Sequence, residues 1–178
     1  APINLEIVAG DLTLDGDITA HGSGDVDLTL GGAGAAVITS AGTDDIASTS
    51  GAITITADTL TLVTGTISST GGALILQPNA ASRTIGLGNG ASGNFSLDAT
   101  ELGLLSNGFS SITLGRTNAG AVDINAHTFT DPVTVVGGAM TVDGLQAGAN
   151  DITLTSSSTI DESVDATTTN ITTTGGLT

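Results

Sequence analysis

Acidic side chains are the residues in this sequence whose type and spacing could support chemistry. The chain has 18 Asp and Glu residues but only two Lys and Arg residues, so its formal net charge is −16. Carboxylate oxygens are ligands for Ca²⁺, which accepts irregular sites built from several oxygen atoms. Eight of the acids lie within the first 45 residues, namely Glu6, Asp11, Asp15, Asp17, Asp25, Asp27, Asp44 and Asp45.

Two pairs of aspartates have a spacing that suits a cation site. Asp15 and Asp17 are two residues apart, which places them on one face of a strand or in one turn, and Asp25 and Asp27 repeat this spacing. Like charges on neighbouring strands repel unless a cation or solvent screens them. A solvated acidic face is the favoured interpretation of these four residues, and a Ca²⁺ site is the alternative. The glycine–aspartate repeat of calcium-binding β-rolls is missing, because Gly31-Gly-Ala-Gly34 runs into Ala-Ala-Val.

Two other motifs could carry chemistry, but a purely structural role explains each of them better. His21 and His127 are far apart in a chain without Cys, so no transition-metal site is expected. The segment Gly88-Asn-Gly-Ala-Ser-Gly93 has the G-x-G-x-x-G spacing of dinucleotide-binding loops. Such a loop must lead into a helix, but the strand-like Asn94-Phe-Ser-Leu97 follows it. A glycine-rich corner is therefore predicted, and no other cofactor is expected.

The composition offers few of the residues that catalysis would need. Enzymes that cleave polysaccharides need paired carboxylates in a cleft, usually with aromatic rings that stack on sugars. The chain has three Phe and no Trp or Tyr. No segment has the pattern of a nucleophile elbow. We expect a protein that is not an enzyme and has no catalytic residues, and a polysaccharide-active β-helix enzyme is the less favoured alternative.

The elements that would position these residues are short strands. Aliphatic residues alternate with small or hydroxyl residues, which is the period of a strand with one buried face. The pattern is clearest from Gly51 to Leu76, and clusters of Gly, Asn, Asp and Ser separate the runs. The same alternation marks Leu12–Leu14, Val26–Leu30, Val37–Ile38, Ile85–Leu87, Phe95–Leu97, Leu102–Leu104, Ile112–Leu114, Val122–Ile124, Val133–Val135, Met140–Val142 and Ile152–Leu154.

The strands recur at intervals that favour an all-β parallel β-helix, or β-solenoid, with roughly 17–27 residues per coil. The predicted markers of successive coils are Leu28, Ile53, Leu74, Phe95, Ile112, Val133 and Ile152. One internal repeat aligns Ile85–Leu102 with Ile112–Phe129 at a constant offset. A β-sandwich is the alternative, because it also uses short strands and frequent turns. Aliphatic residues without large aromatics suit the thin core of a solenoid better.

The domain prediction is a single β-solenoid segment over residues 1–178, taken from a longer fibre or repeat array. Residues 161–178 are Thr-rich and are predicted to form a partial coil or a tail. The acidic surface would repel nucleic acid, and no apolar run has the length of a membrane span. No signal peptide is visible at Ala1-Pro2-Ile3-Asn4. The absence of Cys is compatible with an exported protein.

Four segments resemble repeat modules of giant bacterial exoproteins, which are similar to filamentous haemagglutinins and related adhesins. They are Arg83–Gly88, Glu101–Leu105, Gly108–Arg116 and Thr128–Val135. The resemblance implies a right-handed parallel β-helix shaft that is extracellular or at the cell surface and serves in adhesion, aggregation or coating. Contact with host or neighbouring cells fits the same resemblance. Self-association into fibres is expected for a separate reason: the sequence has no obvious capping segment, so an uncapped solenoid would present open strand edges to further strands. A calcium-dependent or glycan-binding module is the alternative function.

Overall fold

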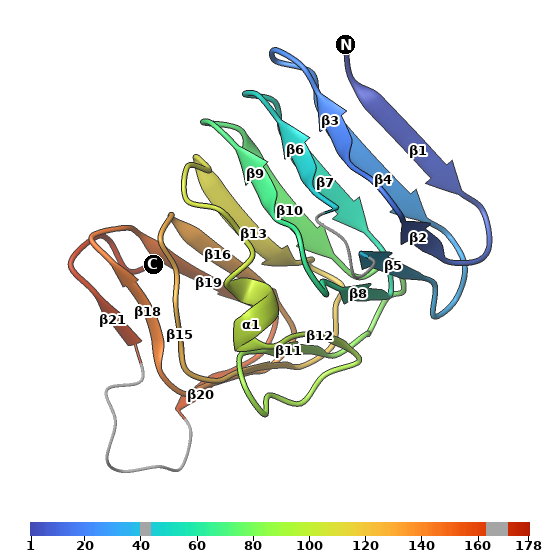
Figure 1. The fold of residues 1–178 in the computed structure, drawn as a ribbon. Helices are drawn as coiled ribbons and strands as arrows, with labels where there is room; N and C mark the ends of the chain where they lie inside the picture. The colour runs from blue at the N-terminus through green and yellow to red at the C-terminus, as the bar shows by residue number, and fades with distance from the viewer. Residues whose placement is uncertain (40–43, 163–170) are drawn as a thin grey trace.

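Short strands wind into a parallel β-helix in the computed structural model of the chain, which describes residues 1–39, 44–162 and 171–178 (Figure 1). Every strand pair among these residues is parallel, which confirms the predicted solenoid and excludes the β-sandwich alternative. Among the same residues, no helix is long and apolar enough to cross a membrane.

One long sheet runs along the whole β-helix and contributes one strand to each coil. Its order is β1 (Ile3–Ile7), β4 (Val26–Leu30), β7 (Ile53–Thr56), β10 (Ala73–Gln77), β13 (Ser111–Gly115), β16 (Val133–Gly137) and β19 (Ile152–Ser156). Its inward residues stack on one another, because each strand is paired in register with the next. Leu28, Ile55, Leu76, Leu114 and Val135 form one such stack, and all five are completely buried. This narrow aliphatic core needs neighbouring coils, as in other solenoids.

Shorter sheets close the coils on the other sides. In the amino-terminal half these are β2 (Leu12–Leu14), β5 (Ala36–Thr39) and β8 (Thr59–Thr61), and separately β3 (Ile18–Ala20), β6 (Ile46–Ser48) and β9 (Ile67–Ser69). In the carboxyl-terminal half they are β12 (Phe95–Leu97), β11 (Ile85–Leu87), β14 (Val122–Ile124), β17 (Met140–Val142) and β20 (Ile160–Glu162), and separately β15 (His127–Thr128), β18 (Leu145–Gly148) and β21 (Ile171–Thr173).

One coil is longer than predicted. Most coils of the long sheet are short, as between the paired residues Ile53 and Leu74. The coil that runs from Leu74 to its partner Ile112 is much longer. It contains both β11 and β12, which pair with each other after the chain folds back. Phe95 lies in β12 and outside the long sheet, so its use as a coil marker was wrong.

The predicted internal repeat describes structurally equivalent positions only in part. Ile85 pairs with Val122, whereas Ile112 pairs with Leu74, so the first strands of the two copies lie in different sheets. The second strands, β12 and β14, lie in the same sheet. The similarity reflects a shared strand-and-turn pattern.

The predicted strand Leu102–Leu104 is also wrong, because α1 (Ala99–Leu102) ends there. A capping box of Asp98 and Glu101 starts this helical turn, since each side chain accepts a backbone N–H group of the other residue. The aliphatic alternation is the same as in a strand, so the capping residues are the signal that distinguishes this segment.

The last described residues continue the coil pattern. β20 pairs with β17, β21 pairs with β18, and Leu177 forms a parallel bridge with Ile152. Residues 160–162 and 171–178 therefore follow the path of the preceding coil. The remainder of the predicted tail, residues 163–170, lies outside the described residues.

Candidate functional site

Aspartates connect neighbouring coils through hydrogen bonds to the backbone. In each case one carboxylate oxygen accepts the backbone N–H of a residue in the next coil. The donor–acceptor pairs are Ala36–Asp11 (2.8 Å), Asp45–Asp17 (3.0 Å), Ala52–Asp25 (2.8 Å), Thr66–Asp45 (2.6 Å) and Gly176–Asp151 (2.5 Å). We call these five contacts the aspartate brackets.

All five brackets occur at the same position in the ladder. Val26, the first residue of β4, pairs with Ile53 of the next coil. Asp25 immediately precedes Val26, and its partner Ala52 immediately precedes Ile53. The backbone N–H at this corner would otherwise have to find water, and a carboxylate is a strong acceptor for it. The local sequence is an Asp followed by alternating inward residues, as in Asp11-Leu-Thr-Leu14 and Asp151-Ile-Thr-Leu154. This signal is visible in the sequence, and it distinguishes the bracket aspartates from cation ligands and from acids on a solvated face.

The four predicted calcium ligands occupy different local settings. Asp15 and Asp17 are exposed in the turn between β2 and β3, and Asp17 forms a bracket. Asp25 also forms a bracket, whereas Asp27 projects outward from β4 and accepts a hydrogen bond from the Thr29 hydroxyl at 3.1 Å. In residues 1–39, 44–162 and 171–178, no three His, Cys, Asp or Glu side chains gather as a metal site. Calcium binding by these residues stays a prediction.

The bracket assignment predicts different effects at two neighbouring acids. Substitution of Asp25→Ala leaves the Ala52 N–H without its acceptor and should lower the free energy of unfolding by about 1 kcal/mol. Asp27→Ala removes the same charge two residues away, but only a contact within its own strand, and should change it by less than about 0.5 kcal/mol. Urea denaturation of both variants with a calcium chelator present measures the difference. Equal effects would show that Asp25 acts only through its charge.

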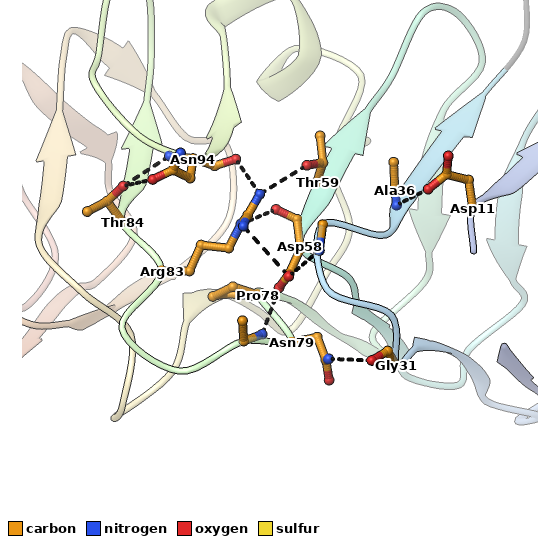
Figure 2. A network of polar contacts seen from close by, with 12 residues as sticks. Asp11, Gly31, Ala36, Asp58, Thr59, Pro78, Asn79, Arg83, Thr84 and Asn94 are labelled. Carbon is orange, nitrogen blue, oxygen red and sulfur yellow. Dashed lines mark hydrogen bonds and ion pairs between the residues drawn. The ribbon is translucent and has the colours of Figure 1, made fainter. Parts of the chain in front are cut away.

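An ion pair with a buried carboxylate joins the two halves of the β-helix. Asp58 is 1% exposed, and its carboxylate lies 3.6 Å from the guanidinium of Arg83, as Figure 2 shows. The same carboxylate accepts the backbone N–H groups of Gly34 at 2.8 Å and Ala80 at 2.7 Å. Arg83 in turn donates to the Asp58 carbonyl oxygen at 2.6 Å. Asp58 thus connects three consecutive coils.

The surroundings of Asp58 favour its charged form. Burial alone would raise the pKa of this carboxyl, but the N–H groups of Ala80 and Gly34 and the charge of Arg83 outweigh burial. The resulting pKa lies below its usual value. Both charged groups also form hydrogen bonds with backbone groups, so this ion pair is well suited to a structural role.

Both arginines of the chain stabilise the segment between β10 and β11. Arg83 also reaches the Asn94 carbonyl oxygen at 3.5 Å, which is at the limit of a hydrogen bond (Figure 2). Arg116 donates to the carbonyl oxygens of Pro78 at 3.2 Å and Asn79 at 2.9 Å. The segment between β10 and β11 is where the long coil begins, and Ser82 has a φ of 61° there. The two cations therefore stabilise the point at which the coil shape changes.

Glu101 ties the helical turn to the preceding coil. One carboxylate oxygen accepts the Leu62 backbone N–H at 3.0 Å, and the other accepts that of Asp98 at 2.9 Å. Burial raises the pKa of Glu101 despite these two hydrogen bonds. Its role resembles that of the brackets, because it satisfies backbone donors in two segments.

The histidines and the glycine motif have structural settings. His127 is half-buried with its ring edge against Phe129 at a centroid distance of 4.7 Å, and burial lowers its pKa. His21 is exposed in another coil. The Gly88–Gly93 segment connects β11 to β12, which confirms the predicted glycine-rich corner.

Comparisons with known proteins do not identify a relative of this chain. No profile of a known protein family, no curated protein and no solved structure matches it. The resemblance to filamentous haemagglutinin modules therefore stays an expectation. The contacts themselves show where the polar residues act, since the aspartate brackets, the Asp58–Arg83 pair and Glu101 all join one coil to another.

Proposed function

We propose that this protein is a non-enzymatic, extracellular structural or adhesive shaft in a bacterial surface fibre. The observation that supports the proposal is the distribution of charged contacts. Carboxylates at the coil corners, and both arginines, bind backbone groups of other coils. Such contacts stiffen a rod without forming a reaction centre.

Self-association is the second part of the proposal. β1 is the outermost strand of the long sheet, and its second backbone edge pairs with no strand in the part of the chain that the structure describes. The inward residues Ile3, Leu5 and Ile7 are only partly buried there. An open strand edge beside aliphatic side chains is a template for further strand pairing. We expect another coil to stack on this edge, supplied either by a second copy of this chain or by another part of the same fibre.

Electron microscopy of the purified protein tests the proposal. At high protein concentration we expect unbranched filaments, with the same frequency in calcium and in a calcium chelator, because the brackets use backbone donors instead of metal ions. An Ile3→Asp, Leu5→Asp variant should form no filaments, since it places two charges among the aliphatic residues of the edge. Thr13→Asp, Thr19→Asp is the matched control, because both threonines are exposed in the same coil. Filaments that dissolve on chelation would instead support cation-bridged assembly.

A further inference from the structure

A polar hollow interrupts the outer surface of the sheet that contains β11, β14 and β17. It has a volume of about 420 Å³ and is open to solvent. One wall is formed by Thr84, Ser92 and Asn94, which lie beside the fold-back between β11 and β12. The floor includes Asp123 of β14 and Thr141 of β17, which are paired across the two strands. The volume is within the range of small-ligand sites, roughly 300–1,000 Å³.

Two glycines allow the fold-back to lie directly on the sheet. Gly86 occupies the outward position of β11, and a Cβ atom there would be 3.0 Å from the Ala91 carbonyl oxygen and from the Gly93 nitrogen. A Cβ atom at Gly93 would overlap the backbone of Gly86. Since both positions lack a side chain, the two backbones can touch, and the fold-back rises as a wall beside the exposed surface of β14.

Hydrogen bonds fix this wall to its surroundings. The Ser92 N–H donates to one carboxylate oxygen of Asp123 at 2.6 Å. The Asn94 N–H donates to the Thr84 hydroxyl at 3.0 Å, and that hydroxyl donates to the Asn94 side-chain oxygen at 2.9 Å (Figure 2). The wall and floor are therefore positioned before any ligand arrives, which reduces the entropy lost on binding.

Several polar atoms of the hollow still have bonding capacity. Within the described residues, the Asn94 Nδ2, the Ser92 Oγ, the Thr141 Oγ1 and the Asp123 Oδ1 make no hydrogen bond with protein groups. They comprise an amide donor, two hydroxyls that donate or accept, and a carboxylate acceptor. This combination complements the adjacent hydroxyl groups of a sugar ring, each of which donates one hydrogen bond and accepts others.

We infer that this hollow binds an uncharged saccharide chain. An anionic glycan is disfavoured, because Asp123 lies in the hollow, Arg83 is bound to Asp58 and the protein carries a formal charge of −16. The lining has no aromatic ring, so each site binds weakly, with a dissociation constant on the order of 1 mM. Repetition along a fibre would raise the overall avidity. The hollow is complete in one copy, so its binding does not depend on filament formation.

Nuclear magnetic resonance titration of the ¹⁵N-labelled protein, at a concentration where it is monomeric, tests the inference. The probes are maltohexaose, xylohexaose, mannohexaose and chitohexaose, with hexagalacturonate as the anionic comparator. We expect saturable shifts of the Ser92, Asn94, Asp123 and Thr141 amides with at least one neutral probe. Hexagalacturonate should bind at least about ten-fold more weakly. No saturable shift with any neutral probe, or shifts confined to another face, would overturn the inference.

Substitutions that leave the backbone contacts intact separate a binding site from a structural effect. Thr141→Val keeps the β-branched shape and removes the hydroxyl, and should weaken binding about five-fold. Adding Ser92→Ala should abolish measurable binding, while the Ser92 N–H still holds Asp123. Thr134→Val is the matched control, because Thr134 faces outward from β16 in the long sheet. Equal affinities of the double variant and the control would contradict the assignment.

Discussion

Gly51→Ala should lower the free energy of unfolding by about 3 kcal/mol or more, or prevent folding. Gly51 lies in a corner where consecutive coils touch through their backbones, and an added Cβ would overlap the Gly24 carbonyl group of the preceding coil. The Ser48 hydroxyl makes the corner tighter, because it donates to the Gly24 oxygen at 2.6 Å and accepts from the Gly51 nitrogen at 2.8 Å. The neighbouring strand ladder fixes both backbones, so neither can move away. Thermal and urea denaturation measure the loss.

Gly16→Ala is the matched control for this prediction. Gly16 also lies between two strands, but a Cβ there would meet no atom within 4 Å, and its φ is not positive. Its replacement should change the free energy of unfolding by less than about 0.5 kcal/mol. If Gly51→Ala melted at the temperature of the unaltered protein, the coils could not be stacked as closely as the structure shows.

Asp58→Ala should destabilise the protein by about 3–5 kcal/mol, because it leaves the largely buried partner Arg83 uncompensated. It also removes the acceptor of the Gly34 and Ala80 N–H groups, which hold the neighbouring coils in place. Asp15→Ala is the control, since Asp15 is exposed in a turn and its loss removes the same charge. A similar small effect of both substitutions would contradict the role of Asp58 as the connection between coils. Urea denaturation at neutral pH gives both values.

The ionisation of Asp58 sets the pH range of this stabilisation. Its pKa in the folded protein is below the usual value near 3.9, so folding favours the charged form. The contribution is complete above the unfolded-state pKa and is lost as the pH falls through the lower pKa of the folded state. The stability difference between the unaltered protein and Asp58→Asn should therefore be constant from about pH 5 to 7 and shrink below about pH 4. A difference that grew toward acid would show the opposite shift.

The strands were predictable because burial alternates with a period of two residues. Ile53-Thr-Ile-Thr56 shows the pattern directly, and the structure buries Ile53 and Ile55 completely. The path of the chain between strands was not predictable in the same way. Phe95-Ser-Leu97 has the same alternation as a strand of the long sheet, yet it pairs with β11 of its own coil. Only the glycines at 86 and 93, which allow that fold-back, distinguish the two cases.

The polar contacts could not be predicted from the sequence, because the partner of each residue depends on which coils are neighbours. Asp58 and Arg83 lie in different coils, and nothing in the sequence indicates that they meet as an ion pair. The aspartate brackets left a weak signal, an acid before an alternating run, but the register was needed to identify the backbone N–H that each one accepts. The polar hollow likewise combines Ser92 and Thr141, which only the fold-back brings together.

The spacing of layers in the filaments tests the shaft proposal most directly. Fibre diffraction from filaments aligned in calcium chelator should show a reflection at about 4.8 Å along the fibre axis, because the coils stack one strand spacing apart along the rod. Its position should not change when calcium is restored. A protein that stays monomeric at high concentration, or filaments whose strand spacing runs across the fibre axis, would contradict a shaft that grows by stacking coils.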